Sequence, residues 1–137
     1  MNVKRIGTAL AAATAVVCLA APAASAVEGP QLGPGEWDYL GSSALQVTGT
    51  YNYFTTNHVK SGGGDFAICL EDATSAGIFT VMEYDPDNAD DKVREVYLSE
   101  GACSILRDIG GYVDGDNNRA EFYVATAGIL GTIGFWD

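Results

Sequence analysis

The stretch from Glu83 to Asp91 carries the residues of this sequence that are best suited to chemistry, and it reads Glu-Tyr-Asp-Pro-Asp-Asn-Ala-Asp-Asp. Four aspartates fall within seven residues. Like charges at this spacing repel one another unless solvent or a cation lies between them. Calcium needs several carboxylate oxygens at short range, so these side chains are candidate calcium ligands: Glu83, Asp85, Asp87, Asp90 and Asp91. The sequence favours the alternative of a solvated hairpin loop, in which the aspartates cap turns.

A second polar turn, residues 114–118, reads Asp-Gly-Asp-Asn-Asn and begins like the calcium loop of an EF-hand. Its sixth position is Arg119 rather than glycine, and its twelfth is Ala125 rather than glutamate, so the EF-hand requirements are not met. A tight turn built from glycine and asparagine is the favoured interpretation. The two acidic turns could still share one rim of the fold and form a joint site.

Short segments of alternating hydrophobicity surround both turns. Residues 65–70 place Phe66, Ile68 and Leu70 on one face. Residues 45–53 also alternate, and Gly49 is expected to form a bulge within that strand. We expect an all-β fold, an antiparallel β-sandwich or barrel of about seven to eight short strands. The other segments with this alternation are residues 78–84, 92–98 and 120–125.

The first 26 residues have the pattern of a secretory signal peptide. Lys4 and Arg5 form its positive start, an apolar run follows, and Ala24-Ser25-Ala26 is a small-residue cleavage signal. No later stretch is apolar over the length of a membrane span. We therefore expect a secreted, extracellular protein with three regions, which are a signal peptide (1–26), an irregular Gly/Pro leader (27–36) and a single β domain (37–137).

The net charge narrows the choice of partners, and the cysteine count predicts a disulfide. Once Lys4 and Arg5 leave with the signal, 5 basic residues face 18 acidic ones, which gives a net charge of −13. Such a surface repels nucleic acid and anionic lipid, and it suits cations or basic partners. Cys69 and Cys103 remain after the loss of Cys18, and an even pair in an exported protein predicts a disulfide between them.

Aromatic residues offer a second candidate surface. Trp37 and Trp136 lie near the two ends of the expected domain, and pairing of the terminal strands would bring both into one core. Aromatic residues on a strand more often pack a core than bind a ligand. The residues that could instead form a carbohydrate- or peptide-stacking face are Trp37, Tyr39, Tyr51, Tyr53, Phe54 and Trp136.

Two family resemblances can be stated. Val81-Met82-Glu83-Tyr84-Asp85, followed by Asp91-Lys92-Val93, resembles the third calcium loop of C2 domains, and it implies a calcium-binding module between two strands. Residues 69–72, 83–87 and 113–123, together with the Ala-rich signal, look like small exported proteins of actinomycetes. That second resemblance implies an exported location and little else.

Catalytic machinery is not evident in the sequence. His58 is the only histidine, and no Gly-x-Ser-x-Gly motif is present. We therefore expect a non-enzymatic, secreted β-sandwich protein that has a binding or structural role outside the cell, with an unidentified extracellular partner. The alternatives are a calcium-binding C2-like module and a secreted inhibitor or antibacterial toxin.

Overall fold

The computed structural model describes residues 37–49, 52–114 and 117–137, and every strand pair in it is antiparallel. The expected signal peptide (1–26) and leader (27–36) lie outside the described residues. The elements, in chain order, are β1 (Tyr39–Ala44), β2 (Gln46–Val47), β3 (Tyr53–Thr55), β4 (Val59–Ser61), β5 (Phe66–Ala73), β6 (Gly77–Glu83), β7 (Asp91–Leu98), β8 (Cys103–Leu106), the 3-10 helix η1 (Ile109–Tyr112), β9 (Ala120–Ala127) and β10 (Gly131–Trp136).

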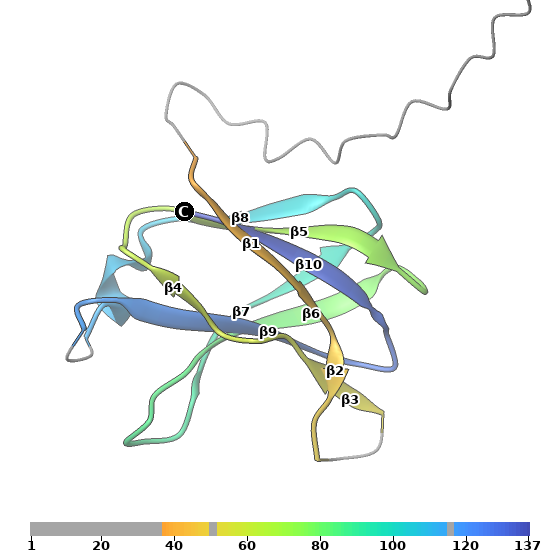
Figure 1. Cartoon of the computed structure of the whole chain (residues 1–137), viewed down its shortest axis with the longest axis horizontal. Coiled ribbons are helices and arrows are strands. Elements are labelled where there is room, and N and C mark those ends of the chain that lie inside the picture. Colours follow the sequence, from red (N-terminus) through yellow and green to blue (C-terminus); the bar gives the residue numbers. More distant parts are fainter. Residues whose placement is uncertain (1–36, 50–51, 115–116) are drawn as a thin grey trace, which may run out of the picture.

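The strands form two sheets that lie face to face (Figure 1). One sheet has the order β1-β10-β5-β8, and the other has the order β2-β3-β9-β6-β7, with β4 also paired to β9. The prediction of an all-β antiparallel sandwich is therefore confirmed. The described residues contain ten strands rather than the seven or eight expected, because β2, β3 and β4 are only two or three residues long and too short to show a period of two.

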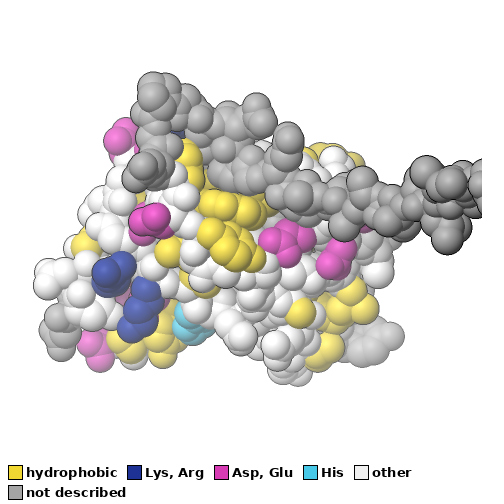
Figure 2. Space-filling view, turned by 45° about the horizontal axis from the view of Figure 1, so that its top comes forward, with side chains coloured by type: hydrophobic (Ala, Val, Ile, Leu, Met, Phe, Trp, Pro, Cys, Tyr) yellow, Lys and Arg dark blue, Asp and Glu magenta, His cyan; other side chains and the backbone are white. Residues whose placement is uncertain are grey.

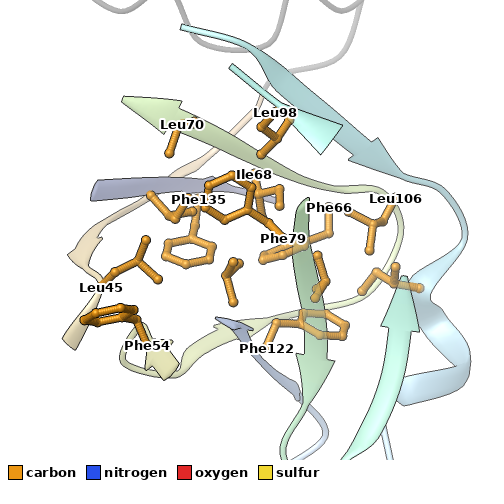
Figure 3. Packing of buried hydrophobic residues seen from close by; sticks show 14 of the residues in the cluster. Leu45, Phe54, Phe66, Ile68, Leu70, Phe79, Leu98, Leu106, Phe122 and Phe135 are labelled. Atoms are coloured by element: carbon orange, nitrogen blue, oxygen red, sulfur yellow. The ribbon is translucent and has the colours of Figure 1, made fainter. Parts of the chain in front are cut away.

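The core lies between the two sheets and follows the alternation of the strands. Phe66, Ile68 and Leu70 of β5 face it from one sheet, and Phe79 of β6 faces it from the other (Figure 3). Val81 of β6 is also completely buried in this cluster. Successive side chains of a strand point to opposite faces, so the residues between these positions point outward. The described residues include no helix long and apolar enough to cross a bilayer.

The single strand expected over residues 45–53 is not formed. The chain passes from one sheet to the other at Leu45, whose backbone N–H donates to the carbonyl oxygen of Gly131 at 2.9 Å. Gly49 has φ 53° and Asn52 has φ 65°, so these residues lie in the turn between β2 and β3 rather than in a bulged strand. Alternation alone gives no sign that a strand changes sheets.

The strand pairing tests two predictions about residues that lie far apart in the sequence. Cys69 lies directly opposite Cys103 in the β5–β8 ladder, and the two form the disulfide that the sequence predicted, with their Cα atoms 4.0 Å apart. The first and last strands do pair, with Tyr39 opposite Trp136. The expectation that Trp37 and Trp136 enter the core is wrong, because both indoles are only half-buried and neither belongs to the buried cluster.

Candidate functional site

Glu83 is a buried carboxylate that continues the core-facing row of β6. Phe79, Val81 and Glu83 alternate along this strand, so all three point to its inner face. The register irregularity in the β6–β7 ladder lies in β7, which leaves the alternation of β6 intact. Only 5% of Glu83 is exposed, although it is the last residue of the strand. The inner face of β6 therefore ends in an acid at the rim of the sandwich.

A cavity of about 530 Å³ opens above Glu83 between the two acidic turns. The loop after β6 forms one wall, and the turn that precedes β9 forms the other; both loops project on the left side of Figure 1. The two turns therefore lie at one rim of the sandwich, an arrangement that the sequence left open. The described residues that line the cavity are Glu83, Tyr84, Asp85, Pro86, Asp87, Asn88, Asp114, Asn117, Arg119 and Glu121.

Asp85 organises the first wall. Its Oδ1 accepts hydrogen bonds from the backbone N–H groups of Asp87, at 2.9 Å, and Asn88, at 3.2 Å. Its Oδ2 accepts a bond from the Asn88 side-chain amide at 2.8 Å. These bonds favour the charged form and lower the pKa of the Asp85 carboxyl. Asp85 therefore caps its own turn, as the hairpin interpretation of this loop expected, while also lining the cavity.

The last two predicted ligands point elsewhere. Asp90 Oδ2 accepts a hydrogen bond of 2.6 Å from the hydroxyl of Tyr123, an outward-facing residue of β9. Burial, together with this acceptor, raises the pKa of Tyr123 well above its ordinary value. Asp91 is exposed at the start of β7, opposite Glu83 in the ladder, and it does not line the cavity. The structure therefore brings together Glu83, Asp85 and Asp87, but not all five candidates.

The electrostatics of the cavity centre on Glu83. Burial is the largest cause that raises the pKa of its carboxyl from 4.5 to about 7, and the charge of Asp114 is the next. Asp85 and Asp91 add to the rise, whereas a hydrogen bond with the backbone of Glu121 opposes it. At neutral pH this group lies close to its midpoint, so a small change in nearby charge alters its protonation.

Basic side chains lie on the β9 side of the cavity. Lys60 Nζ is 2.9 Å from Glu121 Oε1, and the Asn117 amide donates to the same oxygen at 3.1 Å. The contact with Lys60 is the main reason that the pKa of Glu121 is lowered. Arg119 also lines the cavity. Glu121 is therefore neutralised by a neighbour, whereas Glu83 and Asp114 face the cavity with only Arg119 as a basic lining residue among those described.

Metal ligation and the surroundings of His58 are the remaining features of this region. Within residues 37–49, 52–114 and 117–137, no three His, Cys, Asp or Glu side chains lie close enough together to hold a metal ion, so the calcium site stays a prediction. His58 stacks between Tyr84 and Tyr123, with ring centroids 4.4 and 5.1 Å away. Its ring is thus engaged with aromatic neighbours on the outer side of the sheet.

The sequence interpretation missed part of the site. The sequence predicts only a tight turn at Asp114 and Asn117 and indicates no role for Arg119 or Glu121, yet all four line the cavity. The signal for Glu83 was present, because it continues the alternation of Phe79 and Val81 and so had to face inward. No local pattern could place the second turn beside the first, since that contact depends on β9 pairing with β6.

Comparison with known proteins identifies a family and a relative that this chain is similar to. A family described as the YndA coiled coil domain matches residues 39–133. The protein YndA of Bacillus subtilis (strain 168) is 44% identical over 108 residues, which cover 77% of this chain and 76% of the relative. Its name assigns it no activity, and no solved structure matches this chain. The described residues within 39–133 form β-strands and one 3-10 helix, with no coiled coil among them.

These matches correct the resemblances drawn from the sequence. The sequence resembles small exported proteins of actinomycetes and, over residues 83–91, a calcium loop of C2 domains. The relationship that covers most of the chain is instead to the YndA family and a Bacillus protein. Short acidic turns between strands recur in unrelated β-proteins because aspartate and asparagine suit tight turns, so they carry little family information.

Proposed function

This chain belongs to the YndA coiled coil domain family, and we propose that it is an exported, non-enzymatic protein that binds a positively charged group of an extracellular ligand. The binding site is the acidic cavity between the loop after β6 and the turn before β9. The ligand group is an ammonium or guanidinium, as in a lysine or arginine side chain.

The observation that carries this proposal is the placement of Glu83. A charged carboxylate that is removed from water without a partner destabilises the protein, and the group responds by a raised pKa. The pKa of Glu83 is raised to about 7, and the neighbouring charges of Asp114 and Asp85 increase it further. A cationic group in the cavity would supply the missing opposite charge and return Glu83 to its ionised form.

The size of the cavity favours an organic cation over a bare metal ion. Small-molecule sites occupy about 300–1,000 Å³, and the cavity of about 530 Å³ falls within that range. Calcium requires about six to eight oxygens at 2.3–2.6 Å, which demands closer carboxylates than this open arrangement. The acidic balance of the whole sequence, with 18 acidic and 7 basic residues, would also attract a cationic partner from a distance.

Isothermal titration with a hexalysine peptide tests the proposal. At an ionic strength of about 0.15 M, long-range attraction is largely screened and local contacts dominate. Glu83→Gln and Asp114→Asn should each weaken binding about tenfold, since each removes one charge from the cavity. Glu100→Gln removes an equal charge from the exposed turn after β7 and should leave the affinity unchanged. Equal effects of all three variants, or no binding at all, would refute the site.

Calcium is the second candidate ligand, and the repulsion among Glu83, Asp85 and Asp91 is what favours it. Thermal melts in EDTA, calcium and magnesium at equal ionic strength separate the two ligands. Calcium at 100 times its dissociation constant should stabilise the fold by about 2.7 kcal/mol, and magnesium should do less. Combined Asp85→Asn and Asp91→Asn changes should abolish the shift. Identical melts in calcium and EDTA would exclude this candidate and leave the organic cation.

Export is supported by residues 1–26 and can be tested by itself. Cleavage between Ala26 and Val27 should give a secreted chain that begins at Val27, because Ala24-Ser25-Ala26 is a small-residue cleavage signal. Intact-mass measurement of the protein recovered from the culture medium checks this. Recovery of a chain that still begins with Met1 would contradict the signal peptide.

A further inference from the structure

An aromatic pair lies on the outer face of the four-stranded sheet, away from the acidic cavity. Tyr39 of β1 is opposite Trp136 of β10, and their ring centroids are 5.1 Å apart with an angle of 47° between the planes. Tyr39 is 57% exposed. Gly134 makes room for the indole, because a Cβ there would lie only 2.7 Å from Cη2 of Trp136. The absence of a side chain at this position lets the indole of Trp136 lie close to the sheet.

Polar groups are fixed beside the two rings. The Tyr39 hydroxyl and Ser42 Oγ are 2.5 Å apart, and Ser42 Oγ donates to Glu71 Oε1 at 2.6 Å. Glu71 belongs to β5, the strand on the other side of β10, so this chain of hydrogen bonds crosses the sheet over Gly134. The carboxylate is thereby held next to the aromatic pair before any ligand arrives.

Two register irregularities build this arrangement. The β1–β10 ladder shifts between Tyr39 and Gly41, which lets Tyr39 and Ser42, three residues apart, point to the same face. The β10–β5 ladder shifts between Thr132 and Ile133, beside Glu71. Bulges re-aim side chains and are over-represented next to functional sites. In an unbroken β1, Tyr39 and Ser42 would point to opposite faces and could not hydrogen-bond.

We propose that this aromatic–carboxylate platform, formed by Tyr39, Trp136, Ser42 and Glu71, binds a neutral sugar ring of an extracellular glycan. A pyranose presents a face of C–H groups and a rim of hydroxyls. The C–H face packs on the negative face of an aromatic ring, and the hydroxyls need acceptors at its edge. Glu71 and Ser42 supply those acceptors, and a few fixed polar groups beside an apolar surface are what orient a small ligand.

The charge of the platform selects among ligands. Glu71 and the acidic sequence repel uronic acids, phosphates and nucleic acids, so the sugar is uncharged. Figure 2 shows one face of the molecule, on which hydrophobic and acidic side chains lie next to one another. The site is separate from the acidic cavity, so it does not depend on the cation proposed there.

Nuclear magnetic resonance of the indole N–H signals, with cellohexaose and the hexamer of N-acetylglucosamine as probes, tests the platform. One indole signal should shift saturably with at least one of the two sugars. Tyr39→Ala should weaken binding about tenfold, and Glu71→Gln should weaken it as well. Tyr39→Phe keeps the ring and should retain most of the affinity. Weaker binding by Tyr39→Ala than by Tyr39→Phe would then report the loss of the stacking ring.

Tyr97 provides the matched control. It is a 71% exposed tyrosine on β7 of the other sheet, and Tyr97→Ala should leave sugar binding unchanged. A hexaproline peptide tests peptide recognition by the same rings. The proposal is overturned if neither sugar shifts an indole signal at up to about 10 mM, a concentration that would reveal binding even with a millimolar dissociation constant. It is also overturned if Tyr97→Ala and Tyr39→Ala act alike, or if hexaproline binds and the sugars do not.

Discussion

Ser61 donates a hydrogen bond of 2.8 Å to the carboxylate of Asp137, and this bond joins the two sheets of the sandwich. Ser61 ends β4 and is completely buried, whereas Asp137 directly follows β10 of the other sheet. The second carboxylate oxygen accepts from the backbone N–H of Gly62, also at 2.8 Å. One side chain therefore satisfies a buried hydroxyl and the first residue of a glycine-rich turn.

Loss of the Asp137 carboxylate should destabilise the protein. Asp137→Ala leaves the buried Ser61 hydroxyl and the Gly62 N–H without their acceptor, and an unsatisfied buried group costs about 1–3 kcal/mol. Chemical denaturation of the variant measures the change in the free energy of unfolding. Asp38→Ala is the control, because Asp38 pairs with Asp137 only through backbone groups, which that change retains. Equal stability of Asp137→Ala and the unchanged protein would rule out this link.

The Cys69–Cys103 disulfide should supply a large share of the stability. Its sequence separation is 34 residues, and removal of a native disulfide from a small exported domain typically costs about 2–5 kcal/mol. Cys69→Ala should therefore lower the midpoint of denaturation strongly. Cys103→Ala should have a similar effect, and the double variant should be little worse than either, since one bond is lost in all three. Fully additive losses would indicate that packing, not the bond, is responsible.

The fold was predictable from sequence to the extent that it depends on alternation within a strand. Phe66, Ile68 and Leu70 were correctly placed on one face, and the pairing of Cys69 with Cys103 followed from compartment and count. What alternation cannot supply is the path between strands. The change of sheet at Leu45 depends on a long-range contact with Gly131 that local pattern does not encode.

The candidate site was also predictable from sequence only in part. Glu83, Asp85 and Asp87 lie where the cluster of acids in the sequence indicated, at one rim of the sandwich. Asp114 lies in the turn before β9 and Glu121 lies in β9 itself, both 30 or more residues from Glu83, and they meet Glu83 because β9 pairs with β6. The bulge that turns Tyr39 and Ser42 to one face is likewise a property of the ladder, not of a local pattern.

Stability should depend on pH through Glu83. Its pKa in the folded protein is about 7, above the ordinary value of 4.5, so between these values the folded state binds a proton that the unfolded state releases. The free energy of unfolding should therefore fall by about 1–3 kcal/mol as the pH rises from about 4.5 to 7.5. The pKa values of Asp65, Asp85 and Glu121 are lowered, so those groups act mainly below this window.

Glu83→Gln isolates this contribution. Glutamine has nearly the same shape and does not titrate, so the fall in stability across this pH window should disappear or shrink strongly. Denaturation curves at several pH values measure it, with Glu100→Gln as a variant that removes an exposed acid and should keep the dependence. A wild-type profile that is flat, or one that Glu83→Gln leaves unchanged, would show that Glu83 is not the titrating group.

The pKa of Glu83, measured with and without a cationic peptide, tests the central claim most directly. Carbon-13 resonance of its side-chain carboxyl, followed through a pH titration, should give a value of about 7 in the free protein. Saturating hexalysine should move that value down by about one unit or more, because a nearby cation favours the charged carboxylate. A value that stays the same when the peptide is bound would contradict a cation site in the acidic cavity.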